Sequence, residues 1–167
     1  VLARGGDPEA TTSTGQPALH VAIAASSPAT VGVLLDAGAS PTRPDRAGHI
    51  PLGVAVSHGR KDIVRMLLER GANPNEHGAS DGAPLTTAVR RGDADIVQLL
   101  LAHGAKADTG KVDDASLVLA TQRGDAAMVS LLLRSGASPE TTDATGHTAL
   151  WHAACRDDAA VLALLLG

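Results

Sequence analysis

The sequence predicts an all-α fold, a solenoid of stacked pairs of short helices. Glycines that each follow a Leu-rich run recur at separations of 33, 33, 33 and 32 residues, at Gly5, Gly38, Gly71, Gly104 and Gly136. A fixed period of this length indicates a repeat array. The chain is 44% apolar, but it has no Phe, no Tyr and one Trp. A core built from Ala, Val and Leu suits thin layers of closely packed helices.

The repeating unit is clearest in the second copy. A first helix is expected at 51–58, ending at Gly59, and a second at 60–70, ending at Gly71. Asp62 falls in the first turn of the second helix, where the helix dipole favours an acid. Neither helix is long enough to persist alone in water. Their apolar faces must therefore be buried against neighbouring repeats.

Taken in order, the chain is expected to form one continuous solenoid domain. It opens at 1–12 with the tail of a preceding repeat and a first finger, the turn-rich connection that precedes each first helix. Repeats follow at 13–45, 46–78, 79–110 and 111–143, with a truncated fifth at 144–167. Because no polar capping helix is visible, we expect further repeats or domains of the parent chain at both ends.

Three positions depart from the repeat. Ser26 and Asp157 replace the glycine that separates the two helices, and Pro28 fits the first turn of the helix that follows Ser26. The finger of the fourth repeat is one residue short and carries Asp113 and Asp114 where glycine is usual. We expect that finger to be distorted.

The first-helix motif recurs as Gly146-His147-Thr148-Ala149-Leu150, Gly48-His49-Ile50-Pro51-Leu52, Ala83-Pro84-Leu85 and Ala18-Leu19-His20. With the tails after each second helix, such as Gly71-Ala72-Asn73-Pro74-Asn75, these residues resemble the ankyrin repeat across essentially the whole chain. The family's Thr is kept only at Thr148 and its His only at His20. The resemblance implies that the middle repeats lack hydrogen bonds between these positions and depend on packing of Leu and Ala.

Charge and composition exclude several classes of function. The net charge of −4 provides no global positive field for nucleic acid, and no apolar run is long enough for membrane insertion. The single cysteine, Cys155, cannot form an internal disulfide. It favours an intracellular, reducing compartment, either cytoplasm or nucleus.

Two motifs resemble catalytic or phosphate-binding sites. Gly78-Ala79-Ser80-Asp81-Gly82 has the sequence pattern of a nucleophile elbow. In the repeat it falls on a finger, without the parallel sheet that such an elbow needs, and we interpret it as a turn. The stretch 104–111 has the wrong spacing for a phosphate loop and Val112 in place of Ser or Thr. We therefore expect no enzymatic activity and no cofactor.

One pair of side chains has the spacing of metal ligands. His152 and Cys155 lie three residues apart on an expected helix, and His147 is the one obvious addition. A structural or catalytic metal site needs three or four ligands. We interpret the pair as packed or exposed side chains and expect no metal.

The resemblance implies where a partner would bind. In ankyrin arrays the two residues before the glycine between the helices line the concave surface, and the residues before each first helix form the finger tips. After Ala24 and Ala25, the concave residues of later repeats are Ser57, His58, Arg90, Arg91, Gln122, Arg123, Cys155 and Arg156. The finger-tip residues are Arg43, Arg46, His49, Glu76, His77, Ser80, Lys111 and Asp114.

The predicted function is protein binding through the concave surface and the fingers. The Arg stripe, defined as Arg90, Arg91, Arg123 and Arg156, suits an acidic or phosphorylated segment because guanidinium groups pair with carboxylate and phosphate. A solvated polar face without a ligand explains the stripe about equally well. Two other functions stay open, a regulatory segment of a larger enzyme, channel or effector, and a structural spacer.

Asn75 is the only Asn at the family's Asn position. In some ankyrin proteins this residue is hydroxylated. We favour the simpler interpretation that Asn75 stabilises its turn.

Overall fold

The structure is a computed structural model that describes residues 6–79, 82–108 and 115–167. The chain divides into two compact units, 1–84 and 85–167, which are described separately. Within the described ranges there are helices and isolated β-bridges but no strands, as the sequence predicts. The helices are α1 (Ala18–Ala24), α2 (Pro28–Asp36), α3 (Pro51–Ser57), α4 (Lys61–Glu69), α5 (Pro84–Arg91), α6 (Ala94–Ala102), α7 (Ser116–Gln122), α8 (Ala126–Arg134), α9 (Ala149–Cys155) and α10 (Ala159–Leu166).

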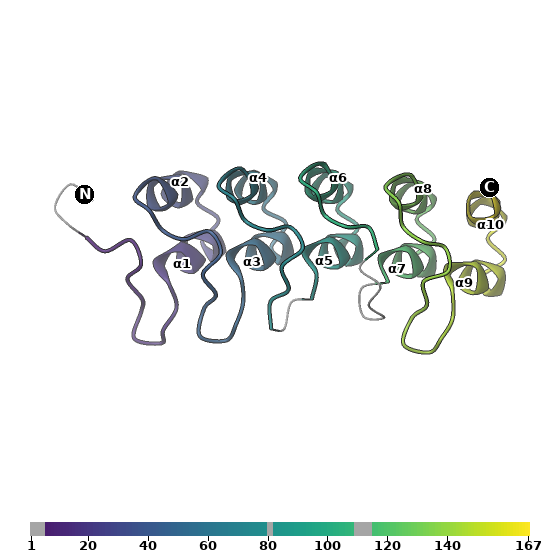
Figure 1. The fold of residues 1–167 in the computed structure, drawn as a ribbon, viewed down its shortest axis with the longest axis horizontal. Coiled ribbons are helices and arrows are strands. Elements are labelled where there is room, and N and C mark those ends of the chain that lie inside the picture. The colour runs from purple at the N-terminus through teal and green to yellow at the C-terminus, as the bar shows by residue number, and fades with distance from the viewer. Residues whose placement is uncertain (1–5, 80–81, 109–114) are drawn as a thin grey trace. The chain divides into compact units, whose positions relative to one another are not determined.

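The first unit contains two helix pairs that stack on each other. α1 packs on α2 and α3 on α4 within the pairs, while α1 contacts α3 and α2 contacts α4 between them (Figure 1). The interface is filled by aliphatic side chains that are almost completely buried, including Ile23, Leu52, Ile63 and Leu67. Short helices thus gain their stability from neighbouring pairs rather than from their own length.

The second unit repeats this arrangement. α7 packs on α8 and α9 on α10, and the pairs stack through α7 against α9 and α8 against α10. Val129, Leu132, Ala153 and Val161 have no exposed surface. The first helix of each pair is called the inner helix and the second the outer helix. The small Ala153 allows the inner helices α7 and α9 to approach closely, as the composition predicts.

Helix boundaries in the second repeat match the sequence-based expectation to within one residue. α3 spans Pro51–Ser57 and α4 spans Lys61–Glu69, with Asp62 in the first turn of α4. Asp93 caps α6 by accepting a hydrogen bond from the Ile96 backbone N–H at 3.1 Å. The equivalent N-cap position of α4 is Arg60, whose side chain makes no capping bond.

The turn between the helices of a pair has the same backbone conformation with or without glycine. Gly59 has φ 67° and Gly124 has φ 70°, while Ser26 and Asp157 adopt φ 60° and 55°. L-residues rarely adopt this left-handed region, because Cβ crowds the backbone there. The repeat therefore keeps its geometry at Ser26 and Asp157, and the two departures place strain at these positions. Pro28 occupies the first turn of α2, as expected.

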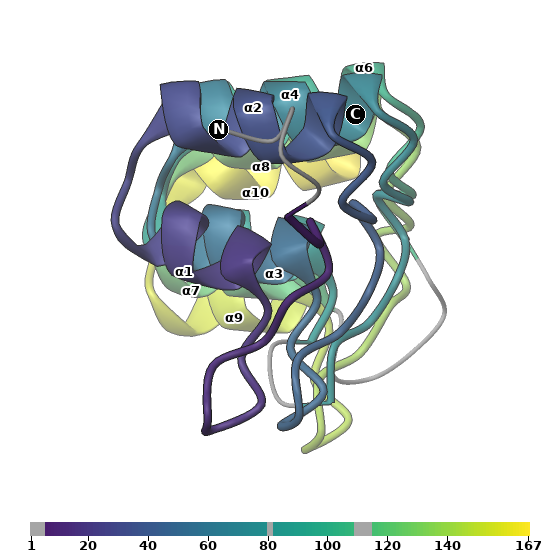
Figure 2. The ribbon, with the colours of Figure 1, turned by 90° about the vertical axis from the view of Figure 1, so that its left-hand side faces the viewer.

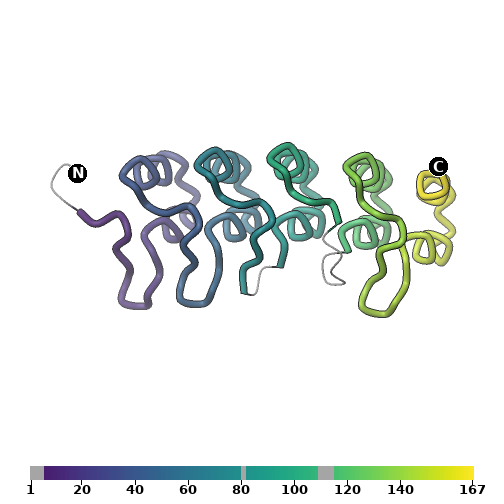
Figure 3. The backbone as a smooth tube through the Cα atoms, viewed as in Figure 1, coloured from purple at the N-terminus to yellow at the C-terminus, as the bar shows by residue number. Residues whose placement is uncertain are grey.

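The fingers before α1, α3 and α9 are narrow loops that fold back on themselves (Figure 3). Isolated antiparallel bridges join Thr11 to Pro17, Gly78 to Gly82 and Thr142 to Thr148. In the first unit the fingers before α1 and α3 run side by side (Figure 2). The distorted finger expected around Asp113 and Asp114 lies outside the described residues.

Large apolar side chains that are exposed belong, among the described residues, to two helix pairs. They are Val21 and Val33 of α1 and α2, and Leu150, Trp151, Leu164 and Leu166 of α9 and α10. No described helix combines the length and apolar character that a membrane span needs.

Candidate protein-binding surface

Ser57 and His58, the predicted concave residues of the second repeat, form hydrogen bonds within their own helix. Ser57 Oγ donates to the Val54 carbonyl at 2.9 Å, and His58 Nδ1 donates to the same carbonyl at 2.8 Å. Both side chains thus add to the bond that the Val54 carbonyl already accepts from the His58 backbone N–H at 3.1 Å. His58 remains exposed and Ser57 is half-buried, so the imidazole is the more accessible of the two side chains.

Arg43 joins the first two fingers. Its guanidinium forms an ion pair with Glu9 and donates to the Glu9 backbone carbonyl at 3.1 Å. Glu9 Oε1 also accepts from the Ser40 backbone N–H at 2.6 Å. The Arg43 guanidinium and then the Ser40 N–H hold the pKa of Glu9 below its ordinary value. Arg43 therefore has a structural partner in addition to its predicted place at a finger tip.

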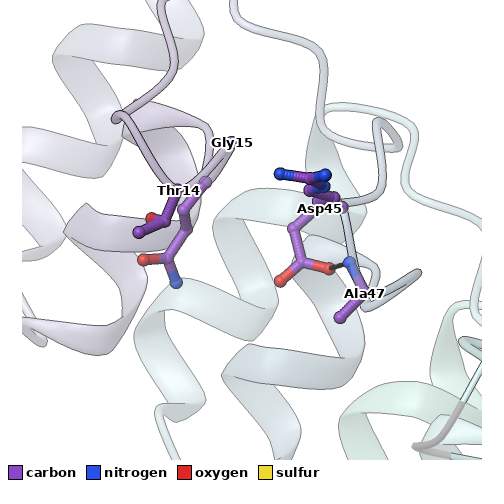
Figure 4. A pocket seen from close by; sticks show the side chains of 6 residues that line it. Thr14, Gly15, Asp45 and Ala47 are labelled. Atoms are coloured by element: carbon purple, nitrogen blue, oxygen red, sulfur yellow. Dashed lines mark hydrogen bonds between the residues drawn. The ribbon is translucent and has the colours of Figure 1, made fainter.

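A cleft of about 340 Å³ opens between these two fingers. Figure 4 shows Thr14 and Gly15 on one side and Asp45 and Ala47 on the other, and Gln16 and Arg46 complete the lining. Arg46 lies against Gly15, because a Cβ at Gly15 would be 3.2 Å from Arg46 Cδ. Arg46 was expected at a finger tip, whereas no spacing in the sequence indicated a cleft.

Asp45 shapes the second finger. Its Oδ1 accepts from the backbone N–H groups of Ala47 and His49, both at 2.9 Å, and its Oδ2 lies 3.1 Å from His49 Nδ1. Partial burial raises the pKa of Asp45, but the bonds to His49 and Ala47 outweigh it and leave the pKa below normal. His49 also accepts, at its carbonyl, a 2.9 Å hydrogen bond from Nε2 of the buried His20. His49 is thus half-buried and held from both sides.

The Arg stripe lies wholly in the second unit, and two of its members reach back to the preceding inner helix. Arg123 Nη1 donates to the Arg90 backbone carbonyl at 3.0 Å, at the end of α5. Arg156 repeats this placement, since a Cβ at Gly124 would be 2.8 Å from Arg156 Nη2. Cations are favoured at the C-terminal end of a helix. All four arginines are exposed, and the repeat positions two of the guanidinium groups in the same way.

The other concave residues of the second unit sit beside the stripe. The Gln122 amide ends 3.1 Å from His152 Nε2, so Gln122 contacts α9. Cys155 is an exposed free cysteine.

The remaining finger residues are only partly described. His77 is exposed and Glu76 is half-buried in the finger before α5. In the preceding turn, Asn73 Oδ1 accepts from the Asn75 backbone N–H at 3.0 Å. Gly78 and Gly82, the two ends of the elbow-like motif, form an antiparallel bridge, and the residues between Ala79 and Gly82 lie outside the described ranges. Ser80, Lys111 and Asp114 lie outside the described residues, as does the end of the stretch 104–111.

Comparison with known proteins agrees with this architecture. A family model described as ankyrin repeats (3 copies) matches residues 1–78 and 85–167. A crystal structure of an ankyrin repeat domain from Acinetobacter baumannii is similar, with a TM-score of 0.87 and 30% identity over 99% of this chain and 87% of that one. A search of curated proteins finds no match. Ankyrin repeats are generally modules for protein–protein interaction and are typically non-catalytic. The all-α fold with paired, stacked helices and the family match together show that the chain belongs to the ankyrin repeat family.

Proposed function

We propose that this ankyrin chain binds a partner protein through its inner-helix ends and fingers and performs no catalysis itself. The observation that carries the proposal is the positioning of Arg123 and Arg156 on the preceding inner helix of the second unit. A side chain that is already held loses less conformational entropy on binding. The Arg stripe is therefore the favoured contact surface.

The partner segment that suits the stripe is acidic or phosphorylated. A guanidinium has five N–H donors, and the bond from Arg123 to the Arg90 carbonyl uses one Nη atom. The remaining donors can form bidentate bonds to carboxylate or phosphate oxygens. Nucleic acid is a poorer candidate, because the chain as a whole carries a net charge of −4.

The fingers of the first unit offer a second contact area. Their cleft combines the Arg46 side chain, the polar Thr14 and Gln16, and the Asp45 turn. Such a mixture of polar groups suits hydrogen bonding to an extended loop of a partner. A reducing compartment fits the exposed Cys155, which would otherwise be open to oxidation.

The test measures binding of fluorescent peptides of equal length that are acidic, phosphorylated, neutral or basic. The variant is Arg90→Glu, Arg91→Glu and Arg123→Glu combined, and the matched control is Arg134→Glu, an exposed arginine on the outer helix α8 of the same unit. We expect the acidic or phosphorylated peptides to bind best, with an affinity that falls as salt rises. The triple reversal should weaken binding at least about tenfold, and the control should not.

Equal binding of all four peptides, or equal effects of the two variants, would refute the stripe as the binding surface. Circular dichroism and thermal unfolding establish that the triple variant is folded. If the protein's biological role survives the triple reversal, a structural spacer becomes the better explanation. Catalytic or membrane-spanning segments elsewhere in the parent chain would favour a regulatory role for the repeats.

A further inference from the structure

Three metal-ligating side chains meet where the last finger joins α9. Asp143 and His147 lie in the finger, and His152 lies on α9. Each contributes one ligand atom, either a carboxylate oxygen or an imidazole nitrogen, and these atoms all lie within 4.8 Å of one another. All three residues are half-buried, so the Asp143/His147/His152 cluster is held by the fold yet accessible to a solvated ion.

Asp143 is fixed by hydrogen bonds that leave one oxygen directed at His152. Its Oδ1 accepts from the Thr145 N–H at 2.9 Å, the Thr145 hydroxyl at 2.6 Å and the His147 N–H at 3.1 Å. Its Oδ2 lies 2.6 Å from His152 Nε2. The Thr145 hydroxyl and then His152 hold the pKa of Asp143 far below its usual range. The bonds at Oδ1 thus fix the carboxylate with Oδ2 facing His152 Nε2.

The His147 ring is held on two sides. The Thr145 hydroxyl lies 2.7 Å from His147 Nδ1, and the Trp151 ring stacks on the imidazole with centroids 3.7 Å apart and planes at 14°. Partners of this kind fix the orientation of histidine ligands in metal sites.

His152 Nε2 is the point on which the cluster converges. Asp143 Oδ2 approaches it to 2.6 Å and the Gln122 amide to 3.1 Å. A single ring nitrogen carries either one proton or one lone pair. It therefore cannot donate to the carboxylate and accept from the amide at the same time.

We propose that the Asp143/His147/His152 cluster binds a divalent transition-metal ion of the Zn²⁺ class. Two imidazoles and one carboxylate form a recognised ligand set for such ions, with water completing the coordination. Ligands at 2.0–2.1 Å from a tetrahedral ion are about 3.4 Å apart, so Oδ2 and Nε2 must separate by under 1 Å. The ion takes the place of any proton between them, which is released to solvent.

The second repeat provides an internal comparison. Asp45, Gly48 and His49 form the same turn as Asp143, Gly146 and His147, and in both turns the carboxylate accepts from equivalent backbone N–H groups. The position equivalent to His152 is Val54, which has no ligand atom. That turn therefore offers only two ligands and should not hold the ion.

The test titrates the full chain with ZnCl₂ and measures the heat of binding by calorimetry. A second titration with CoCl₂ is followed by absorption and by fluorescence. Trp151 is the only Trp, so its emission reports on this site alone. The disabling variant is His152→Val, which copies the second repeat, and the matched control is His49→Gln. Cys155→Ser tests whether the thiol one helical turn away contributes.

We expect one Zn²⁺ per chain, quenching of Trp151 by Co²⁺, and no thiolate charge-transfer band. His152→Val should weaken binding at least about tenfold, while His49→Gln and Cys155→Ser should leave it unchanged. Absence of saturable binding, or binding that His152→Val leaves intact, overturns the proposal, and so does loss of binding in Cys155→Ser. Circular dichroism of His152→Val excludes unfolding, and Asp143→Asn should reproduce the loss if that variant is compromised.

Discussion

Thr86 Oγ1 and Ser116 Oγ lie 3.0 Å apart in the buried contact between α5 and α7. Their residues are 5% and 1% exposed, so neither hydroxyl can exchange its partner for water. Each satisfies the other, which offsets the cost of burying two polar groups. This bond joins two inner helices by side chains alone.

Removing one of these hydroxyls should cost more than removing both. Thr86→Val leaves the Ser116 hydroxyl buried without its partner, and Ser116→Ala does the same to Thr86, each at about 1–3 kcal/mol. The double variant should be more stable than the sum of the single effects predicts. Urea unfolding of the four proteins gives the coupling energy, and additive effects would contradict the pairing.

An aspartate at the N-cap of α4 should stabilise the first unit. Arg60 occupies this position without a capping bond, whereas Asp93, Asp125 and Asp158 cap the equivalent helices. We expect Arg60→Asp to raise the free energy of unfolding by about 0.5–1 kcal/mol and Asp93→Ala to lower it by about 1 kcal/mol. Thermal unfolding measures both effects. If Arg60→Asp leaves the stability unchanged while Asp93→Ala lowers it, the turn before α4 has a different geometry and the prediction is wrong.

Glycine at 26 or 157 should also be stabilising. Ser26 and Asp157 are held at φ 60° and 55°, which costs an L-residue about 1–2 kcal/mol, while glycine loses about 0.5–1 kcal/mol in chain entropy. Ser26→Gly and Asp157→Gly should therefore gain up to about 1 kcal/mol. The reverse control is Gly124→Ala, at φ 70°, which should lose stability. Denaturant midpoints that move in the same direction for both kinds of variant would contradict this account.

The ion pair between Glu9 and Arg43 should contribute a stability that depends on pH. The pKa of Glu9 is lower in the folded state than its ordinary value of 4.5. The contribution is thus complete above that value and is lost as pH falls through the lower folded-state pKa. Because the pair is partly exposed, Glu9→Gln should cost only about 0.2–1 kcal/mol at pH 7 and progressively less towards pH 3. Urea midpoints of both proteins across this range provide the check, and a difference that does not change with pH would disprove the assignment.

Repeat spacing was sufficient to predict the helix pairs, because a period of 33 residues with glycine stops fixes where short helices begin and end. The members of the Arg stripe lie at the ends of α5, α7 and α9, and their role in binding stays a prediction. Repeat spacing could not predict that Arg123 binds the Arg90 carbonyl, because a backbone acceptor leaves no mark in the sequence. The Asp143/His147/His152 cluster was not predicted for a related reason. The sequence indicated His147, His152 and Cys155 as candidate ligands but not Asp143, because only the path of the finger brings Asp143 to His152.

Several bonds between neighbouring repeats share one property, since their acceptors are backbone carbonyls. His20 donates through its side chain to the carbonyl of His49, and Arg123 does the same to that of Arg90. No substitution removes a backbone carbonyl. Such a hydrogen bond can therefore be gained or lost by changing only the donor side chain, with no matching change in the repeat that provides the acceptor. An array built this way can duplicate a repeat and let the copies diverge one residue at a time while the junctions remain intact.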